Sequence, residues 1–95
     1  MYLTDFAMES KIEIIQINIS GEDKPGMTSS LTDILARYDA FILDIGQANI
    51  HQSLTLGILF MTTSDKSGAI LKELLFKASE LGVMIRFTPI TEEQY

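Results

Sequence analysis

The stretch from Ser20 to Leu31, SGEDKPGMTSSL, gathers residue types that can recognise a small charged molecule. A glycine in the first turn of a helix lets a ligand approach backbone N–H groups that have no partners inside the helix, and the helix dipole favours an anion there. The carboxylate of an amino acid is such an anion. Its ammonium group would need an acidic side chain nearby, which Asp23 or Glu22 could supply. These residues are therefore compatible with a site for a zwitterion.

The same residues also suit an ordinary strand-to-helix turn. Gly21 can end the strand, Asp23 can accept hydrogen bonds from the turn, and the φ of Pro25 suits the first turn of a helix. Gly26 would then only relieve crowding, and Thr28 with the two serines after it would be ordinary polar residues. The residues by themselves leave both interpretations open.

Other kinds of site lack the residues that they need. Gly21 and Gly26 have the spacing of a phosphate-binding loop, but Met27 stands where that loop requires a lysine. The sequence contains no cysteine and no Gly-x-Ser-x-Gly nucleophile motif. The single histidine, His51, falls at the end of a predicted hairpin, where a solvated surface role is expected. We therefore expect this chain alone to have no catalytic residues, no metal site and no cofactor.

The composition indicates one small domain. The 95 residues are 46% hydrophobic and 21% charged, which is enough for a core. The net charge of −6 argues against nucleic acid and anionic membranes as partners, because both are bound by clustered lysine and arginine. The apolar runs are too short to span a bilayer, and the first ten residues lack the features of a secretory signal. The absence of cysteine agrees with a cytoplasmic location.

Hydrophobic periodicity predicts the elements that position the Ser20–Leu31 stretch. Alternating residues predict strands, and apolar residues spaced three and four apart predict helices. Gly46 and Gly57 fall inside strands and suggest bulges or close backbone approach. In the second helix, Leu75 is expected in the buried stripe and Glu73 is expected to pair with Lys77. The predicted strands are 11–20, 41–51, 53–62 and 83–90, and the predicted helices are 27–40 and about 67–81.

This order predicts an α+β fold, the ferredoxin-like βαββαβ sandwich, in which a four-stranded antiparallel sheet carries both helices on one face. We expect residues 1–10 to form a lead-in, residues 11–91 to form the domain, and residues 92–95 to form a polar tail. The fold does not by itself define a function.

The sequence GEDKPGMTSSLTDIL at the first strand-to-helix junction, within this order of elements, resembles an ACT domain, the small-molecule-sensing module of amino-acid metabolism. The resemblance covers Ile12 to Ile90. The segments ISGEDKPGMTSSLTDILARYDAFILDIGQANIHQSLTLGILF and AILKELLFKASELGVMIRFTPI are similar to the amino-terminal ACT region of bacterial phosphoserine phosphatases of the ACT-containing type. That resemblance implies a haloacid-dehalogenase-type catalytic domain that binds magnesium and is missing from these 95 residues.

The resemblance also implies where a ligand would bind. In ACT domains the ligand lies between two copies, held by the first loop and helical turn of one copy and the second strand of the other. Gly26 corresponds to the glycine that admits the ligand, and Asp23 to the loop carboxylate. The implied binding residues are Asp23, Lys24, Pro25, Gly26, Met27 and Thr28 from the loop, and Asp44, Gly46 and Gln47 from the strand.

The function implied by the resemblance is regulatory. The domain would bind a small amino acid, with L-serine as the first candidate, as a homodimer, and would act on the catalytic domain in cis by product feedback in serine biosynthesis. Two alternatives stay open. One is a dimerisation module that binds no ligand, and the other is a free-standing ACT protein that regulates another protein.

Overall fold

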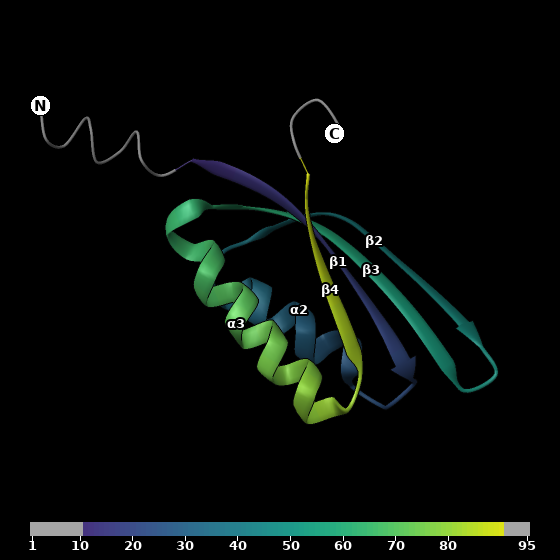
Figure 1. Ribbon diagram of the computed structural model, residues 1–95. Coiled ribbons are helices and arrows are strands. Elements are labelled where there is room, and N and C mark those ends of the chain that lie inside the picture. Colours follow the sequence, from purple (N-terminus) through teal and green to yellow (C-terminus); the bar gives the residue numbers. More distant parts are fainter. Residues whose placement is uncertain (1–10, 91–95) are drawn as a thin grey trace, which may run out of the picture.

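The computed structural model describes residues 11–90 (Figure 1). The order of the elements is the predicted one. The expected lead-in, residues 1–10, and the residues from 91 onward lie outside the described residues. The elements are β1 (Ile12–Glu22), α2 (Met27–Arg37), β2 (Phe41–Ile50), β3 (Ser53–Thr63), α3 (Ser64–Leu81) and β4 (Met84–Ile90).

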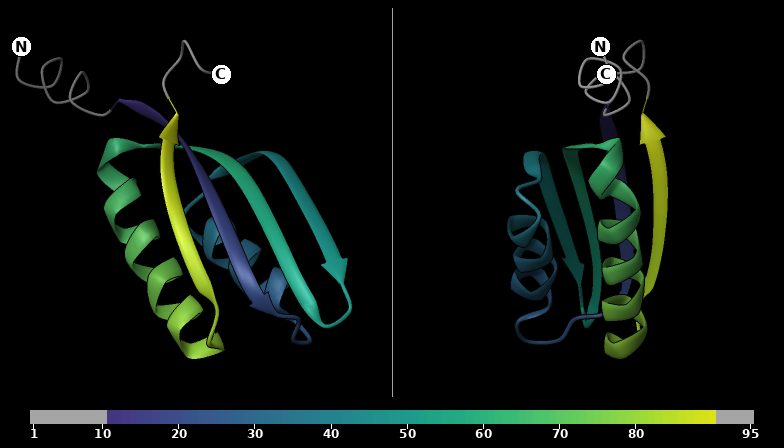
Figure 2. Two further views of the ribbon diagram at one scale, coloured as in Figure 1. Left: turned by 45° about the vertical axis from the view of Figure 1, so that its right-hand side comes forward. Right: turned by 90° about the vertical axis from the view of Figure 1, so that its left-hand side faces the viewer.

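The four strands form one antiparallel sheet in the order β2-β3-β1-β4, which makes β2 and β4 the edge strands. Both helices cover the same face of this sheet (Figure 2). The α+β, ferredoxin-like fold predicted from the sequence is thereby confirmed. The face opposite the helices carries no other element among residues 11–90.

The core lies between the helices and the covered face of the sheet. Successive side chains of a strand point to opposite faces, so every second residue of β1 and β3 enters the core. The helices supply a stripe at helical spacing. The buried apolar residues are Ile15, Ile17, Ile19, Met27, Leu31, Ile34, Leu35, Leu54, Leu56, Ile58, Phe60, Ile70, Leu74 and Ala78.

Several details differ from the sequence-based expectation, and both helices have other bounds: α2 ends at Arg37 and not at residue 40, and α3 begins at Ser64 and not near residue 67. Leu75 is 51% exposed, because α3 contacts the sheet along a narrow stripe through Ile70, Leu74 and Ala78. The irregularity in the central hairpin is not at a glycine. It lies at Leu43, where the pairing of β2 with β3 slips by one residue. The effect of this bulge is to reverse the faces of all later β2 residues.

A polar cluster joins the end of α2 to the middle of α3. The Tyr38 hydroxyl donates to Glu73 Oε2, and Arg37 Nη2 lies 3.0 Å from Glu73 Oε1. The hydrogen bond from Tyr38, helped by the nearby guanidinium, lowers the pKa of Glu73, and the same hydrogen bond raises the pKa of Tyr38. The expected Glu73–Lys77 pair is wrong, because Lys77 Nζ instead lies 3.2 Å from Glu80 Oε1.

The lowered pKa of Glu73 predicts a pH dependence of stability. A carboxyl group whose pKa is lower in the folded state stabilises the fold above its unfolded-state pKa, and that stability is lost as the pH falls through the folded-state pKa. We therefore expect the urea midpoint to fall as the pH is lowered below about 5. Tyr38→Phe removes the main cause of the lowered pKa, so its midpoint should fall less over the same range. A Tyr38→Phe variant with the pH profile of the unmodified domain would contradict this assignment.

Candidate functional site

The loop between β1 and α2 reaches the helix through Gly26, which has φ +76°. Glycine adopts this left-handed conformation freely, whereas other residues adopt it at a cost of roughly 1–2 kcal/mol. A Cβ at this position would meet only Ser29 Oγ, at 3.9 Å. Gly26 is therefore needed by the backbone, and it also leaves the start of α2 open to a small molecule.

The first turn of α2 presents two unused backbone donors. The Met27 N–H donates to Lys24 O (3.3 Å), and the Ser30 N–H donates to Gly26 O (3.0 Å). The N–H groups of Thr28 and Ser29 have no acceptor among residues 11–90. No side chain caps this end of the helix. The unused donors lie at the positive end of the helix dipole, where an anion is stabilised.

A chain of side-chain hydrogen bonds connects this helix start to β2. The Thr28 hydroxyl donates to Gln47 Oε1 (3.1 Å), and Gln47 Nε2 donates to Asn49 Oδ1 (2.9 Å). Asn49 Nδ2 then donates to Asp23 Oδ2 (2.8 Å). The Asp23 N–H donates to Gln52 O (2.8 Å), which ties the loop to the turn between β2 and β3. We call Asp23, Thr28, Gln47 and Asn49 the junction network.

The junction network brings together three of the residues proposed from the sequence: Asp23, Thr28 and Gln47. It adds Asn49, which the sequence analysis missed. Asn49 lies two residues after Gln47 on the same face of β2, so strand alternation from Gln47 was the signal that could have found it.

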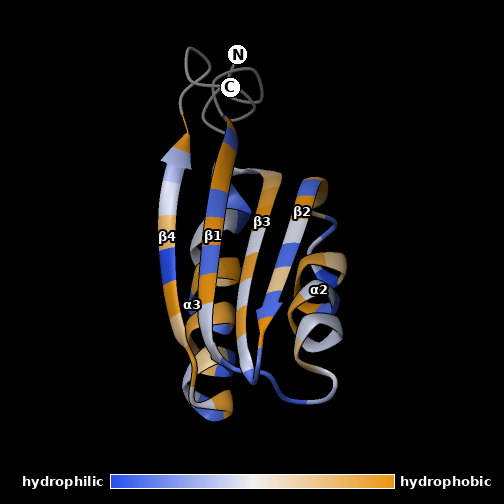
Figure 3. Cartoon of the chain, turned by 90° about the vertical axis from the view of Figure 1, so that its right-hand side faces the viewer, coloured by the Kyte–Doolittle hydropathy of each residue, from blue (hydrophilic) through white to orange (hydrophobic). Residues whose placement is uncertain are grey.

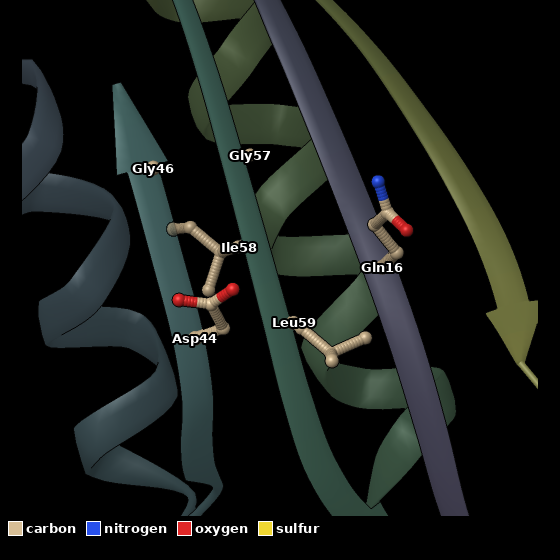
Figure 4. Close-up of a pocket in the computed structure, with 6 residues that line it drawn as sticks. All are labelled: Gln16, Asp44, Gly46, Gly57, Ile58 and Leu59. Atoms are coloured by element: carbon tan, nitrogen blue, oxygen red, sulfur yellow. The ribbon is translucent and has the colours of Figure 1, made fainter. Parts of the chain in front are cut away.

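Asp44 and Gly46 lie elsewhere. The register places Asp44 opposite Leu59 and Gly46 opposite Gly57, on the face of the sheet that the helices leave open. They line a shallow hollow of about 240 Å³ in which Gln16 also takes part (Figure 4). Within one copy, the sheet separates them from the junction network. Their role in ligand binding stays a prediction.

The remaining loop residues have more local roles. Lys24 Nζ lies 2.6 Å from Leu81 O, so this side chain caps the last turn of α3. The Met27 side chain is 1% exposed and belongs to the core, which leaves only its backbone to face a ligand. Pro25 is exposed and precedes Gly26, so it lies outside the first turn of α2 that the sequence suggested for it.

The described part of the chain contains neither a metal-binding cluster nor a membrane-crossing helix. No three acidic or histidine side chains of residues 11–90 gather closely enough to hold a metal ion. Neither α2 nor α3 has the length and apolar character that a membrane-crossing helix requires.

The protein is a small ferredoxin-like domain, in which a four-stranded antiparallel sheet carries two helices on one face. Its polar surface junction lies where the first strand meets the first helix. A sequence model of the ACT domain matches residues 13–88. The chain belongs to the ACT domain family, a regulatory fold that binds small molecules.

Among curated proteins, the chain is similar to phosphoserine phosphatase SerB2 of Mycobacterium tuberculosis. The two are 38% identical over 52 residues, which is 55% of this chain. The chain spans only 12% of that relative's length. The similarity therefore concerns one region of a much longer enzyme.

Three solved structures illustrate the shared fold. A candidate glycine cleavage system transcriptional repressor has a TM-score of 0.81 and 14% identity, over 88% of this chain and 49% of that one. An ACT domain protein from Streptococcus pneumoniae has a TM-score of 0.69 and 20% identity, over 81% and 89%. The ACT domain from the GTP pyrophosphokinase of Chlorobium tepidum has a TM-score of 0.63 and 24% identity, over 82% and 100%. At these identities the likeness shows the fold alone.

The contact of Lys24 with α3 predicts a structural role for this side chain. Lys24→Met removes a cation from the negative end of the α3 dipole, so we expect a loss of about 0.5–1 kcal/mol in the free energy of unfolding, measured with urea. Lys66→Met is the matched control, because Lys66 lies in the first turn of the same helix, where removal of a cation should be neutral or slightly stabilising. Equal losses in the two variants would contradict the capping role.

Proposed function

We propose that this ACT domain binds a small amino acid, with L-serine as the first candidate, and that binding regulates a phosphoserine phosphatase catalytic domain in the same protein. The observation that carries the proposal is the junction network, which holds the Asp23 carboxylate beside the start of α2, where two N–H groups are unused. The similarity to one region of a phosphoserine phosphatase supports serine, which is the product of that class of enzyme.

Each charged group of an amino acid has a counterpart at the junction. The carboxylate would accept hydrogen bonds from the N–H groups of Thr28 and Ser29 at the positive end of α2. The ammonium group would donate to Asp23, whose Oδ1 is not used by Asn49. The amide of Gln47 and the hydroxyl of Thr28 are placed to meet a polar side chain, such as the hydroxyl of serine. The site thus has the chemistry of a zwitterion receptor.

We propose that a second copy of the domain closes this site along β2. As an edge strand, β2 carries unpaired backbone groups, which are a template for pairing with another strand. Every residue from Asp44 to Ile50 is exposed, and Ile45, on the helix side, is 44% exposed. Gln47 and Asn49 belong to the same strand. Pairing along β2 would therefore place a second β2 next to the junction and create a site shared by two copies.

The rest of the proposal concerns the longer protein. The catalytic domain, and the magnesium that such a domain binds, would lie outside these residues, and the whole enzyme would act in the cytoplasm on O-phospho-L-serine. A free-standing regulator of another protein is the alternative if no catalytic domain accompanies this chain. A dimerisation module without a ligand is the alternative if the junction binds nothing.

Ligand binding can be tested by thermal unfolding. At 100 times its Kd, L-serine should add about 2.7 kcal/mol to the stability, which for a domain of this size raises Tm by on the order of 10 °C. Asp23→Asn keeps an acceptor for Asn49 but removes the charge, so it should weaken binding by about 10-fold or more. Glu22→Gln, one residue away and outside the junction network, should bind as the unmodified domain does.

Asp23→Asn is preferable to Gly26→Ala, because the positive φ of Gly26 makes the alanine variant strained whether or not a ligand binds. Absence of a Tm shift with millimolar L-serine, glycine and other small amino acids would rule out the ligand-binding role. A shift that survives Asp23→Asn undiminished would place the site elsewhere.

Dimerisation along β2 can be tested separately by analytical ultracentrifugation. A lysine on an edge strand opposes strand pairing, so Ile45→Lys should weaken association along β2 and weaken the binding of serine. Leu75→Lys replaces a similarly exposed apolar residue on α3 and should leave both properties unchanged. If Ile45→Lys associates and binds serine as the unmodified domain does, β2 is not the interface.

A further inference from the structure

The face of the sheet opposite the helices carries large exposed apolar residues, and Figure 3 shows hydrophobic positions along the strands of this face. The strand registers place four of them on this open face, two toward each end of the strands. Surfaces of monomeric proteins seldom leave large apolar patches uncovered. The four are Ile12, Phe41, Ile50 and Met84, and they are between 63% and 75% exposed.

The middle of the open face is polar and carries one charge of each sign. Asp44 lies on the edge strand β2, and Arg86 lies on the opposite edge strand, β4. The only other charged side chain at open-face strand positions is Glu22, at the end of β1. Neither Asp44 nor Arg86 forms an ion pair with another residue in the range 11–90. The two adjacent cross-strand rows are Asp44–Leu59–Gln16–Thr88 and Gly46–Gly57–Asn18–Arg86.

The paired glycines of the second row are not explained by the domain's own packing. Neither Gly46 nor Gly57 has a positive φ. A Cβ at Gly46 would meet nothing within 4 Å, and one at Gly57 would meet only Asn18 Oδ1, at 3.5 Å. Glycine weakens a strand interior, so side chains would be expected here unless the space is used. The space that the two glycines leave open is the hollow of about 240 Å³ beside Asp44.

We propose that the open face is an interface between two copies of this chain, stacked face to face about a two-fold axis that runs along the strands. With this axis, β2 of each copy lies over β4 of the other copy. Each cross-strand row lies over the same row of the second copy. Arg86 of each copy then enters the other copy's hollow at Gly46 and Gly57, one row from Asp44. Two equivalent ion pairs result.

The apolar residues agree with this axis. The row Phe41–Met61–Ile14–Ile90 faces the same row of the second copy, so apolar side chains meet one another. A two-fold axis perpendicular to the strands would instead lay each edge strand over its own copy, so that a central axis brings Arg86 toward Arg86 and Asp44 toward Asp44, which charge repulsion disfavours. The arrangement of charges therefore selects one of these two stackings.

The dimensions of the face are sufficient for a weak but specific contact. Four strands about 4.8 Å apart, each about 25–35 Å long, give a face of roughly 500–600 Å². Two such faces bury roughly 1,000 Å² in total, which is near the lower limit of specific interfaces. Aligned sheets pack about 10 Å apart, so an arginine from one sheet can reach the surface of the other. The edge of β2 stays free for the pairing proposed above.

A charge exchange tests the interface. In an Ile45→Lys background, which disfavours pairing along β2, we would compare the parent with Asp44→Arg, Arg86→Asp and the double variant by sedimentation equilibrium at low salt. Each single change places like charges against each other and should weaken association at least about 10-fold. The double exchange restores complementarity and should associate within about 3-fold of the parent.

A second variant separates the interface from folding. Gly46→Val fills the hollow where the domain itself has room, so we expect unchanged or higher Tm together with weaker association. Gly68→Ala on α3, where an added Cβ also meets nothing within 4 Å, should leave association unchanged. A parent that stays monomeric to about 500 μM would overturn the proposal and leave the face to a different domain. A double exchange no stronger than the single changes, or a Gly46→Val variant that associates like the parent, would also overturn it.

Arg86→Asp, made without Ile45→Lys, separates this interface from the amino-acid site. Arg86→Asp lies outside the junction network and should leave the serine-induced Tm shift unchanged. Loss of face-to-face association with an intact Tm shift, or the reverse, therefore identifies which of the two proposals has failed.

Discussion

The rest of the structure depends on the one-sided burial of the sheet. Ile15, Ile17 and Ile19 of β1 enter the core together with alternate residues of β3, and the two helices cover them. Because side chains alternate along a strand, a slip of one residue would move this whole set to the open face, so burial fixes the register strongly. The same register places the end of β1 next to the β2–β3 turn. The loop from β1 to α2 and the start of α2 lie at this same end of the sheet.

The bulge at Leu43 decides what each half of β2 can do. Without the extra residue, Asp44 and Gly46 would point toward the helices, and Gln47 and Asn49 would point away from them. With it, the two amides lie beside Thr28 and Asp23, and Asp44 lies on the open face. A single irregularity thus divides one edge strand between two surfaces. One surface carries the amides of the junction network beside Asp23, and the other carries an acidic group in a shallow hollow.

Two charged side chains of this domain, Glu73 and Lys24, find their partners on other elements. Glu73 is held by Tyr38 and Arg37 from the other helix, and Lys24 reaches the last turn of α3 from the first loop. Spacing along one helix predicted a different partner for Glu73. Helical spacing shows which side chains are close on one helix. Here the Tyr38 hydroxyl and the Arg37 guanidinium, which come from the end of α2, bind the Glu73 carboxylate in place of Lys77.

Local sequence by itself determined the order of the elements and the buried stripes of β1, β3 and α2, because hydrophobic periodicity records burial directly. It also identified the loop around Gly26, and resemblance supplied the family. Only the tertiary structure showed that Asn49 completes the junction network, that Lys24 caps α3, and that Asp44 and Gln47 lie on opposite faces. These depend on strand register and on a bulge that no glycine or proline marks, so they are set by packing between segments far apart in the chain.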